Sequence, residues 1–368
     1  MRIETIQAMA GAAVLSSFTY VPILAKSYLG EGEFYISLIV TVYATASFIS
    51  SYVFGRAGDI FGRRVVLHAG LFISTISFVL VSVAYSAEFL LIIRALNGFS
   101  VGIYPGALAA YAYETDMPMG RFASFGAIGW GFGTILAGFA AGFDIRAAFW
   151  ITGVFFMIAF ISAMGLPEIQ RERINVPLFP LETIKRNLPV YAAVLIRHSS
   201  AFAIWTYWPL FLAALGADLL MIGVIQAMNS IAQVVFMIGI TDRFQCERLI
   251  VMGLVTSAIT FLWFAVVTDF IQILPTQILL GFSWACLYVG ALKYVTERNE
   301  ERATASGLLT SVMSISGMIG PIIAAAYFTI WPSYLPIILN AVVMSLVALV
   351  IFWVSSKRLD SYLEMPAC

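Results

Sequence analysis

Charged residues are scarce in this chain of 368 residues, because they make up 11% of it while hydrophobic residues make up 61%. A soluble domain carries about a quarter charged residues. The chain therefore has too little polar surface to cover a water-soluble globule of its length. We expect its surroundings to be lipid.

Cysteine and histidine are scarce as well, and neither shows the spacing of metal ligands or of a disulfide scaffold. The residues concerned are Cys246, Cys286, Cys368, His68 and His198. We also find no catalytic triad and no phosphate-binding loop, so we expect no metal, no cofactor and no enzyme. The formal net charge is zero, which leaves no basic field for nucleic acid.

What the sequence does contain is long apolar runs. A membrane-spanning helix needs about 20 mostly apolar residues, and twelve segments meet that condition. They lie at 6–26, 34–55, 65–85, 87–112, 122–142, 147–166, 188–213, 219–240, 249–268, 271–292, 303–328 and 333–356. The prediction is an all-α integral membrane protein with twelve transmembrane helices.

The short loops give the orientation, because Lys and Arg concentrate on the cytoplasmic side. With both termini inside, the cytoplasmic side holds sixteen of these residues and the outside only Lys26 and Arg146. The sixteen are Arg2, Arg56, Arg63, Arg64, Arg121, Arg171, Arg173, Lys185, Arg186, Arg243, Arg248, Lys293, Arg298, Arg302, Lys357 and Arg358. We predict a multi-pass protein of the cytoplasmic (inner) membrane with both termini in the cytoplasm.

The two halves of the chain repeat short motifs in the same order, about 183 residues apart. The matching residues are Asp59 with Asp242, Phe61 with Phe244, Gly98 with Gly281 and Glu114 with Glu297. We expect an N-terminal six-helix bundle over 1–166, a cytoplasmic linker over 167–187 and a C-terminal six-helix bundle over 188–368. Two parallel repeats of this kind are related by a pseudo-twofold axis along the membrane normal.

One polar motif, GRAGDIFGRR over residues 55–64, lies between the second and third predicted spans. It places Gly55, Asp59, Gly62, Arg63 and Arg64 in the pattern Gly-x3-Asp-x2-Gly-Arg-(Arg/Lys). In this pattern the chain resembles the major facilitator superfamily of secondary transporters. Arg94 followed by Asn97 and Gly98 in the fourth predicted span is similar to a second motif of that family.

The resemblance implies a function for the first motif. In that family the segment forms a cytoplasmic contact with the eleventh span, here called the latch, which holds the outward-facing state. Asp59 and Arg63 would form the latch, with Glu114 or Asp116 as a charge partner. The residues themselves fit this, since glycines allow a tight reversal and Asp59 can face a helix N-terminus or an arginine. The alternative is a plain positively charged loop.

Two arginines, Arg94 and Arg197, fall inside predicted spans, one in each half. Insertion of such a residue costs about 2.5–3.5 kcal/mol, so it points to a functional site. A guanidinium binds carboxylate or phosphate through two parallel hydrogen bonds. The pair therefore indicates an anionic or strongly hydrogen-bonding substrate. In the alternative, each arginine pairs with carbonyls or with a polar neighbour such as Asn97 and fixes helix packing.

Acidic residues are missing from the middle of the predicted spans, where many proton- or sodium-coupled members of the resembled family keep one. Carboxylate-driven proton symport is thus disfavoured, while uniport, exchange and coupling through another group stay open. Glu114 and His198 are the nearest proton-carrier candidates. Because a positive neighbour favours the neutral ring, we expect His198, next to Arg197, to be a hydrogen-bond donor.

Other polar and aromatic residues share helix faces and are candidates for a substrate cavity. They are Gln226, Asn229 and Gln233 on the eighth predicted span and Gln277, Trp284 and Tyr288 on the tenth. Together with Arg94, Arg197, Asn97 and His198 they make up the predicted cavity set. Hydrogen bonding between helices is the alternative for the amides.

The predicted function is a secondary transporter that moves a small organic solute, favoured to be an anion, by alternating access. An exporter of amphipathic or lipophilic compounds is the alternative within transport. A transporter-like sensor or a membrane enzyme is a remote one. The expected partners are the substrate and the lipid bilayer, with the coupling ion unassigned. A monomer suffices, because the fold needs no second chain to make a cavity.

Overall fold

The computed structural model describes residues 2–31, 33–168, 176–217, 219–331 and 333–363. Arg171 and Arg173 of the predicted linker and Cys368 lie outside these residues. The described chain is almost entirely helical and contains no strand. Its main helices are α1 (Arg2–Ile23), α2 (Glu33–Phe61), α3 (Arg63–Leu80), α4 (Ala87–Ile103), α5 (Pro105–Glu114), α6 (Met119–Ala141), α7 (Ile145–Met164), α8 (Leu181–Ala214), α9 (Leu219–Gly239), α10 (Cys246–Val266), α11 (Ile273–Glu297), α12 (Arg302–Ile330) and α13 (Leu335–Leu363).

The prediction of twelve spans is confirmed, because twelve helical segments of the described residues are long and apolar enough to cross a membrane. In lipid each span must satisfy its own backbone hydrogen bonds, and an α-helix does this. The largest boundary difference is at α8, which begins at Leu181 rather than at the predicted residue 188. Proline is favoured in the first turn of a helix, and Pro189 is therefore consistent with a start at residue 188. In the structure Pro189 lies inside α8 instead.

The fourth span is divided into two helices. It runs over Ala87–Glu114, and α4 ends at Ile103 while α5 begins at Pro105. Proline lacks a backbone N–H and fits only the first turn of a helix without disruption. Pro105 therefore starts a new helix, and the short α5 carries Glu114 at its end.

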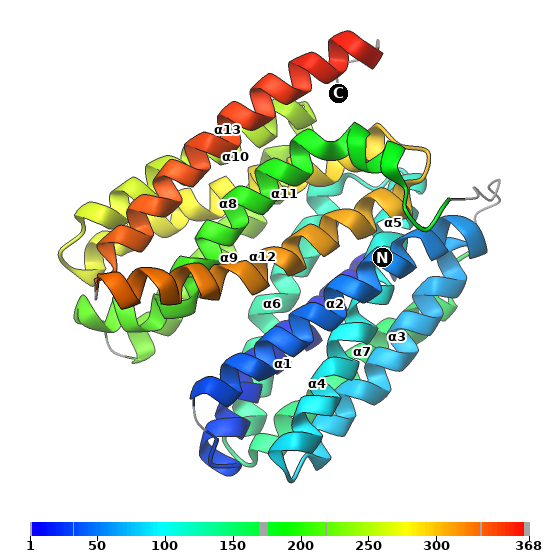
Figure 1. Cartoon of the computed structure of the whole chain (residues 1–368). Coiled ribbons are helices and arrows are strands. Elements are labelled where there is room, and N and C mark those ends of the chain that lie inside the picture. The colour runs from blue at the N-terminus through cyan, green and yellow to red at the C-terminus, as the bar shows by residue number, and fades with distance from the viewer. Residues whose placement is uncertain (1, 32, 169–175, 218, 332, 364–368) are drawn as a thin grey trace. The chain divides into compact units, whose positions relative to one another are not determined.

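Contacts divide the chain into two compact units, each of which is described by itself. One runs up to Pro180 and includes Asn299–Ser314, and the other comprises Leu181–Arg298 and the chain from Ile315 on. In the first unit α1 packs on α6 and α7, α2 on α4, and α3 on α4 and α7 (Figure 1). The first part of α12 belongs to this unit, next to α2 and α5.

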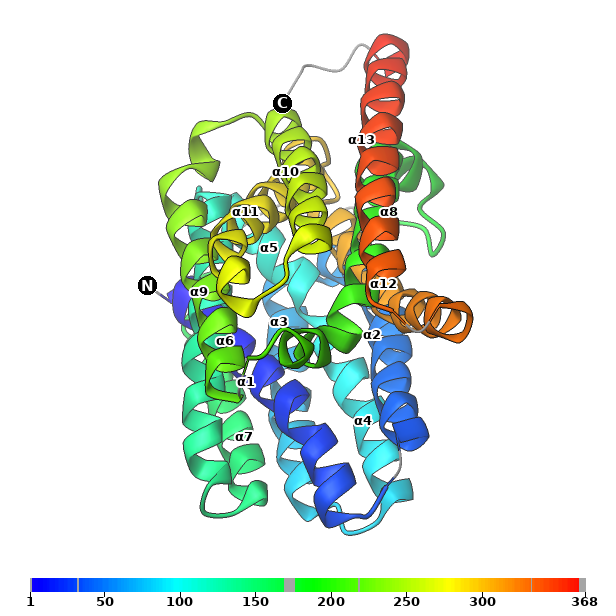
Figure 2. The ribbon, with the colours of Figure 1, turned by 90° about the vertical axis from the view of Figure 1, so that its left-hand side faces the viewer.

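Helix pairing in the second unit follows the same scheme as in the first. Here α8 packs on α13, α9 on α11, and α10 on α11 and α13, and Figure 2 shows α13 running alongside α8. These pairs correspond to α1 with α7, α2 with α4, and α3 with α4 and α7. The two halves of the chain, which share short sequence motifs, thus also share the same pattern of helix pairs. The division into six-helix halves at 167–187 stays a prediction.

Candidate functional site: a buried polar network and two intramembrane arginines

The motif over residues 55–64 is helical rather than an extended loop. The second span continues as α2 to Phe61, and α3 begins at Arg63. Only Gly62 lies between them, with φ of 100°, a backbone conformation that glycine adopts without a steric penalty. The reversal is therefore made at one residue, and Asp59 sits on the last turn of α2.

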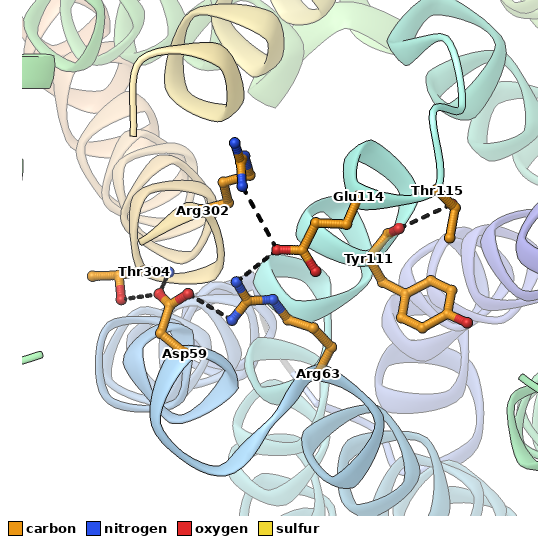
Figure 3. A network of polar contacts seen from close by, with 7 residues as sticks. All are labelled: Asp59, Arg63, Tyr111, Glu114, Thr115, Arg302 and Thr304. Atoms are coloured by element: carbon orange, nitrogen blue, oxygen red, sulfur yellow. Dashed lines mark hydrogen bonds and ion pairs between the residues drawn. The ribbon is translucent and has the colours of Figure 1, made fainter. Parts of the chain in front are cut away.

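Asp59 is buried, and each of its carboxylate oxygens has a partner (Figure 3). Oδ1 lies 2.5 Å from Nη1 of Arg63. Oδ2 accepts hydrogen bonds from the backbone N–H of Thr304 at 2.7 Å and from its hydroxyl at 2.5 Å. Thr304 is the third residue of α12, so its N–H has no acceptor within that helix. The carboxylate thus occupies the N-terminus of α12, where the helix dipole favours negative charge.

Arg63 extends the network to the fourth span. Its Nη2 lies 2.9 Å from Oε1 of Glu114, and both side chains are less than a tenth exposed. Arg302, the first residue of α12, lies 3.8 Å from the same oxygen (Figure 3). The structure therefore brings Asp59, Arg63 and Glu114 together. Asp116, the other predicted charge partner, is exposed and has φ of 56°.

Small residues let the helices around this network approach closely. A β-carbon on Gly307 would lie 2.5 Å from Cα of Gly55, and one on Gly106 would lie 2.5 Å from the carbonyl oxygen of Ala303. Both distances are far below van der Waals contact. Gly55 of the motif is thus required for the approach of α2 to α12. Ser51 and Ser311 join the same two helices by a hydrogen bond of 2.7 Å.

The other arginines of the motif have different contacts. Arg64 donates to the carbonyl oxygen of Met164 at the end of α7, at 3.0 Å. Arg56 donates two hydrogen bonds, of 3.1 and 2.8 Å, to the carbonyl oxygen of Val176 after α7. Arg64 was predicted as a latch residue, but this hydrogen bond joins it to α7 and not to α12. Arg56 and Arg64 therefore anchor the segment around the end of α7.

Arg94 is buried in the first unit and 2% exposed. Its guanidinium donates to Ser17 Oγ at 3.3 Å and to Asn97 Oδ1 at 3.4 Å, and its Cζ lies 4.2 Å above the ring of Tyr43. These contacts join α1, α2 and α4. They agree with the packing alternative, in which Asn97 is a partner of Arg94. Nε of Arg94 and Nδ2 of Asn97 have no hydrogen-bond partner.

Arg197 is buried in the second unit and 1% exposed. Its Nε donates to Ser257 Oγ at 2.9 Å, and Ser257 in turn is 2.6 Å from Ser283. Nη2 is buried without a partner. Counted from Leu181, Arg197 lies 16 residues into α8, about 24 Å at 1.5 Å per residue. It therefore lies well inside the span.

His198, Trp284 and Tyr288 form one aromatic group in the second unit. The ring of Trp284 stacks on His198 at 4.8 Å and on Tyr288 at 5.4 Å. From the sequence, Trp284 and Tyr288 were predicted as cavity residues because they share a helix face, and His198 because it is next to Arg197. The structure places them side by side, on α8 and α11.

The amide residues of the predicted cavity set bond mainly to one another. Asn229 donates to the carbonyl oxygen of Gln277 at 3.3 Å and accepts from Gln233 at 2.6 Å. Gln277 is buried, and its side chain donates to Thr276 at 3.3 Å. These bonds agree with the alternative of hydrogen bonding between α9 and α11. Gln226 lies on the same helix but is exposed.

A further ion pair, missed from the sequence, lies in the second unit, where the Arg298 side chain is 4% exposed and the Glu247 side chain 31%. Arg298, directly after α11, is 2.5 Å from Glu247 in the first turn of α10, and its Cζ lies 4.3 Å from the ring of Tyr294. Arg298 follows Glu297, which had been matched with Glu114. Gly98 matches Gly281 at a spacing of 183 residues, but Gly106 matches Gly290 at 184. With this added residue Glu114 corresponds to position 298, which is the signal that could have identified Arg298.

Carboxylates of the described chain avoid the middle of the membrane. Within the twelve spans, every described Asp and Glu lies among the first or last three residues of its span. The sequence prediction of a carboxylate-free interior is thus confirmed for these residues. No group of three or more potential metal ligands occurs among them either.

Comparison with known proteins gives a consistent result. The sequence model described as Major Facilitator Superfamily matches residues 6–240 and 190–362. The chain is 26% identical to Multidrug resistance protein 1 of Bacillus subtilis, over 89% of both chains. It is 23% identical to the class B Tetracycline resistance protein of Escherichia coli, over 86% of both. Among solved structures, the human organic anion transporter MFSD10 (TETRAN) is similar in fold, with a TM-score of 0.78 and 15% identity over 95% of this chain and 99% of that one.

Proposed function

The chain belongs to the Major Facilitator Superfamily, and from this we propose that it moves a small organic anion across the cytoplasmic membrane by alternating access. Transport rather than chemical conversion is the activity of such a protein. We propose Arg197 of the second unit as the residue that recognises the substrate inside the membrane, with Arg94 as the corresponding candidate of the first unit.

One observation carries the proposal of an anion. Arg94 and Arg197 are almost completely buried, and among the described residues neither forms an ion pair with a carboxylate. A buried charge without a counter-ion is strongly unfavourable. An anionic substrate would supply the missing negative charge. Both arginines also keep a buried nitrogen without a partner, so each has a donor left for that ligand.

The network around Asp59 supports the alternating-access part of the proposal. A transporter must form and break contacts at one end of its pathway in each cycle. The contact of Asp59 with Thr304 joins residues 245 positions apart in the chain and depends on only a few hydrogen bonds. We propose it as the latch that stabilises the outward-facing state.

Coupling by a carboxylate in the middle of a span has no support, because the described spans hold none there. We propose uniport or substrate exchange. Exchange would appear in proteoliposomes as stimulation of uptake by internal substrate, without any effect of a proton or sodium gradient.

The test is uptake by proteoliposomes of radiolabelled organic anions, with neutral and cationic analogues of the same size. Arg197→Gln should lower the affinity for the anion more than tenfold, to the point where binding is lost at working concentrations. The yield of folded protein should stay near wild type. The magnitude follows from the loss of a charged hydrogen bond, about 1.5–3 kcal/mol. Binding is measured by calorimetry.

Arg248→Gln is the matched control, because it makes the same change at an exposed position and should leave binding intact. Loss of folded protein in Arg197→Gln, with unchanged affinity in the fraction that folds, would assign Arg197 to packing. Equal uptake of anionic and cationic analogues by wild type would refute the anion proposal.

A second candidate, export of amphipathic or lipophilic compounds, is favoured by the multidrug and tetracycline resistance proteins among the relatives. Its test is growth of a drug-sensitive host that expresses the chain. A raised resistance to lipophilic cations, unchanged in Arg94→Gln and Arg197→Gln, would favour this candidate over anion transport.

We further propose that the protein is a monomer of the inner membrane with both termini in the cytoplasm. The support is the distribution of Lys and Arg over the short loops, together with a fold that is complete in one chain.

A further inference from the structure

Three aromatic rings of the second unit lie nearly parallel. His198 and Trp284 are inclined by 14°, with centroids 4.8 Å apart, and Trp284 and Tyr288 by 13°, with centroids 5.4 Å apart. The ring of Phe202 is nearly perpendicular to that of His198, at 88°, with centroids 4.9 Å apart. We call His198, Trp284 and Tyr288 the ring stack.

Arg197 lies against the ring stack. Its Cζ is 5.7 Å from the ring centroid of Trp284 and 5.3 Å from that of Phe261, within the range of cation–π attraction. Its Nε is held by Ser257 at 2.9 Å. Two polar atoms of this cluster, Nη2 of Arg197 and Nδ1 of His198, are buried without a partner. A fixed cation and a flat aromatic surface therefore lie side by side, with donor capacity left over.

Core packing by itself does not explain this arrangement. Trp284, Tyr288 and His198 are only partly buried, whereas Arg197 is 1% exposed, so the rings keep surface that a ligand can cover while the charge is withdrawn from water. At the repeat spacing of 183 residues, position 284 corresponds to Val101 in the first half. The repeated fold therefore does not require tryptophan at this place.

We propose that Arg197 and the ring stack form a subsite for planar aromatic carboxylates, and that this is the substrate class of the transporter. The inference rests on the proposed function and makes it more specific. The carboxylate would pair with the guanidinium, and the aromatic ring would stack in an offset geometry on the ring stack. An aliphatic acid has no face to stack, and an aromatic cation meets a buried positive charge.

The test uses four probes of similar size on the purified full-length protein in lipid nanodiscs, with Kd measured by calorimetry. They are 2-naphthoate, the neutral 2-naphthamide, the aliphatic decahydro-2-naphthoate and the cationic 2-naphthylmethylammonium. We expect 2-naphthoate to bind at least about tenfold more tightly than each of the others, because each of them lacks either the carboxylate for the ion pair or the aromatic face for stacking.

Two variants assign the preferences to residues. Trp284→Leu should bring the affinities for 2-naphthoate and decahydro-2-naphthoate to within about twofold of each other, and Trp284→Phe should restore part of the difference, because it restores a ring face. Arg197→Gln should remove the preference for 2-naphthoate over 2-naphthamide. Trp263→Leu is the matched control, since Trp263 is 39% exposed on α10, and it should change neither preference.

The outcomes distinguish failure of the aromatic subsite from failure of the proposed anion transport. Equal affinity of wild type for 2-naphthoate and decahydro-2-naphthoate would refute the aromatic subsite but leave anion transport standing. Equal affinity for 2-naphthoate, 2-naphthamide and the ammonium probe would refute both. Because these comparisons use wild-type protein, they hold even if Trp284→Leu does not fold. Unchanged preferences in a folded Trp284→Leu protein would also overturn the assignment.

Discussion

Asp59 combines two contacts that a neutral side chain cannot combine. One oxygen pairs with Arg63, and the other accepts the N–H and the hydroxyl of Thr304. Hydrogen bonds to a charged group contribute about 1.5–3 kcal/mol each, but burial of the carboxylate opposes them. The net attraction is therefore modest, as the proposed latch requires if it is to open in every cycle.

Asp59→Asn tests this balance. The amide oxygen still accepts from Thr304, but the ion pair with Arg63 is lost, so the proposed outward-facing state should lose about 1.5–3 kcal/mol. That corresponds to a shift of about 12- to 160-fold in the population ratio of outward to inward states, with slower transport. Spin-label distance measurements give the populations.

Asp116→Asn provides the control, because Asp116 is exposed and has φ of 56°, a conformation that asparagine also tolerates. It should leave the populations unchanged. A distance distribution for Asp59→Asn that matches wild type would exclude Asp59 as the latch.

At the residue scale, the sequence identified Arg94, Arg197 and Asp59 but not most of their partners. A charged residue inside an apolar run can be recognised from the sequence alone, and so can the motif glycines. Asn97 could be named as a partner of Arg94 because it lies three residues away on the same helix. Ser257 could not be named for Arg197, since it lies on another helix, 60 positions away in the chain.

Each unit has an ion pair between equivalent helices, and the charges of the two pairs are reversed. In the first unit Arg63 begins α3 and Glu114 ends α5. In the second, Glu247 lies in the first turn of α10 and Arg298 follows the end of α11. Helix dipoles favour acids at N-termini and bases at C-termini. The second pair follows this preference and the first opposes it, because Arg63 must also pair with Asp59.

Exchange of the charges in each pair tests this interpretation. Glu247→Arg with Arg298→Glu keeps an ion pair but opposes both dipoles, so we expect a loss of about 1–2 kcal/mol in stability with transport retained. Arg63→Glu with Glu114→Arg favours the dipoles but places a carboxylate beside Asp59, so transport should be lost. Thermal unfolding and proteoliposome uptake measure the two effects.

The single variants Arg63→Glu and Glu247→Arg serve as references, since each leaves like charges together and should destabilise more than its double variant. Equal loss of transport in both double variants would show that the polarity of the first pair has no connection with Asp59.

For the whole molecule, the orientation in the membrane follows from charge rather than from packing. The proposed cytoplasmic side carries sixteen Lys and Arg residues and the outside two. We expect green fluorescent protein fused to the C-terminus to fluoresce and alkaline phosphatase fused there to be inactive, as for a cytoplasmic end. A fusion within 142–144, between α6 and α7, should give active phosphatase. The reverse pattern would place both termini outside.

The sequence by itself determined the class of protein, the twelve spans and the carboxylate-free interior. These properties are local, because each helix in lipid must satisfy its own backbone and exclude charge over about 20 residues. The family resemblance implied a contact of Asp59 with the eleventh span, but the sequence could not determine that Thr304 at the N-terminus of α12 is the partner, or that His198 and Trp284 stack. Such contacts depend on how helices rotate and approach one another, as at Gly55 and Gly307. Only packing in three dimensions decides which residues of distant helices come into contact.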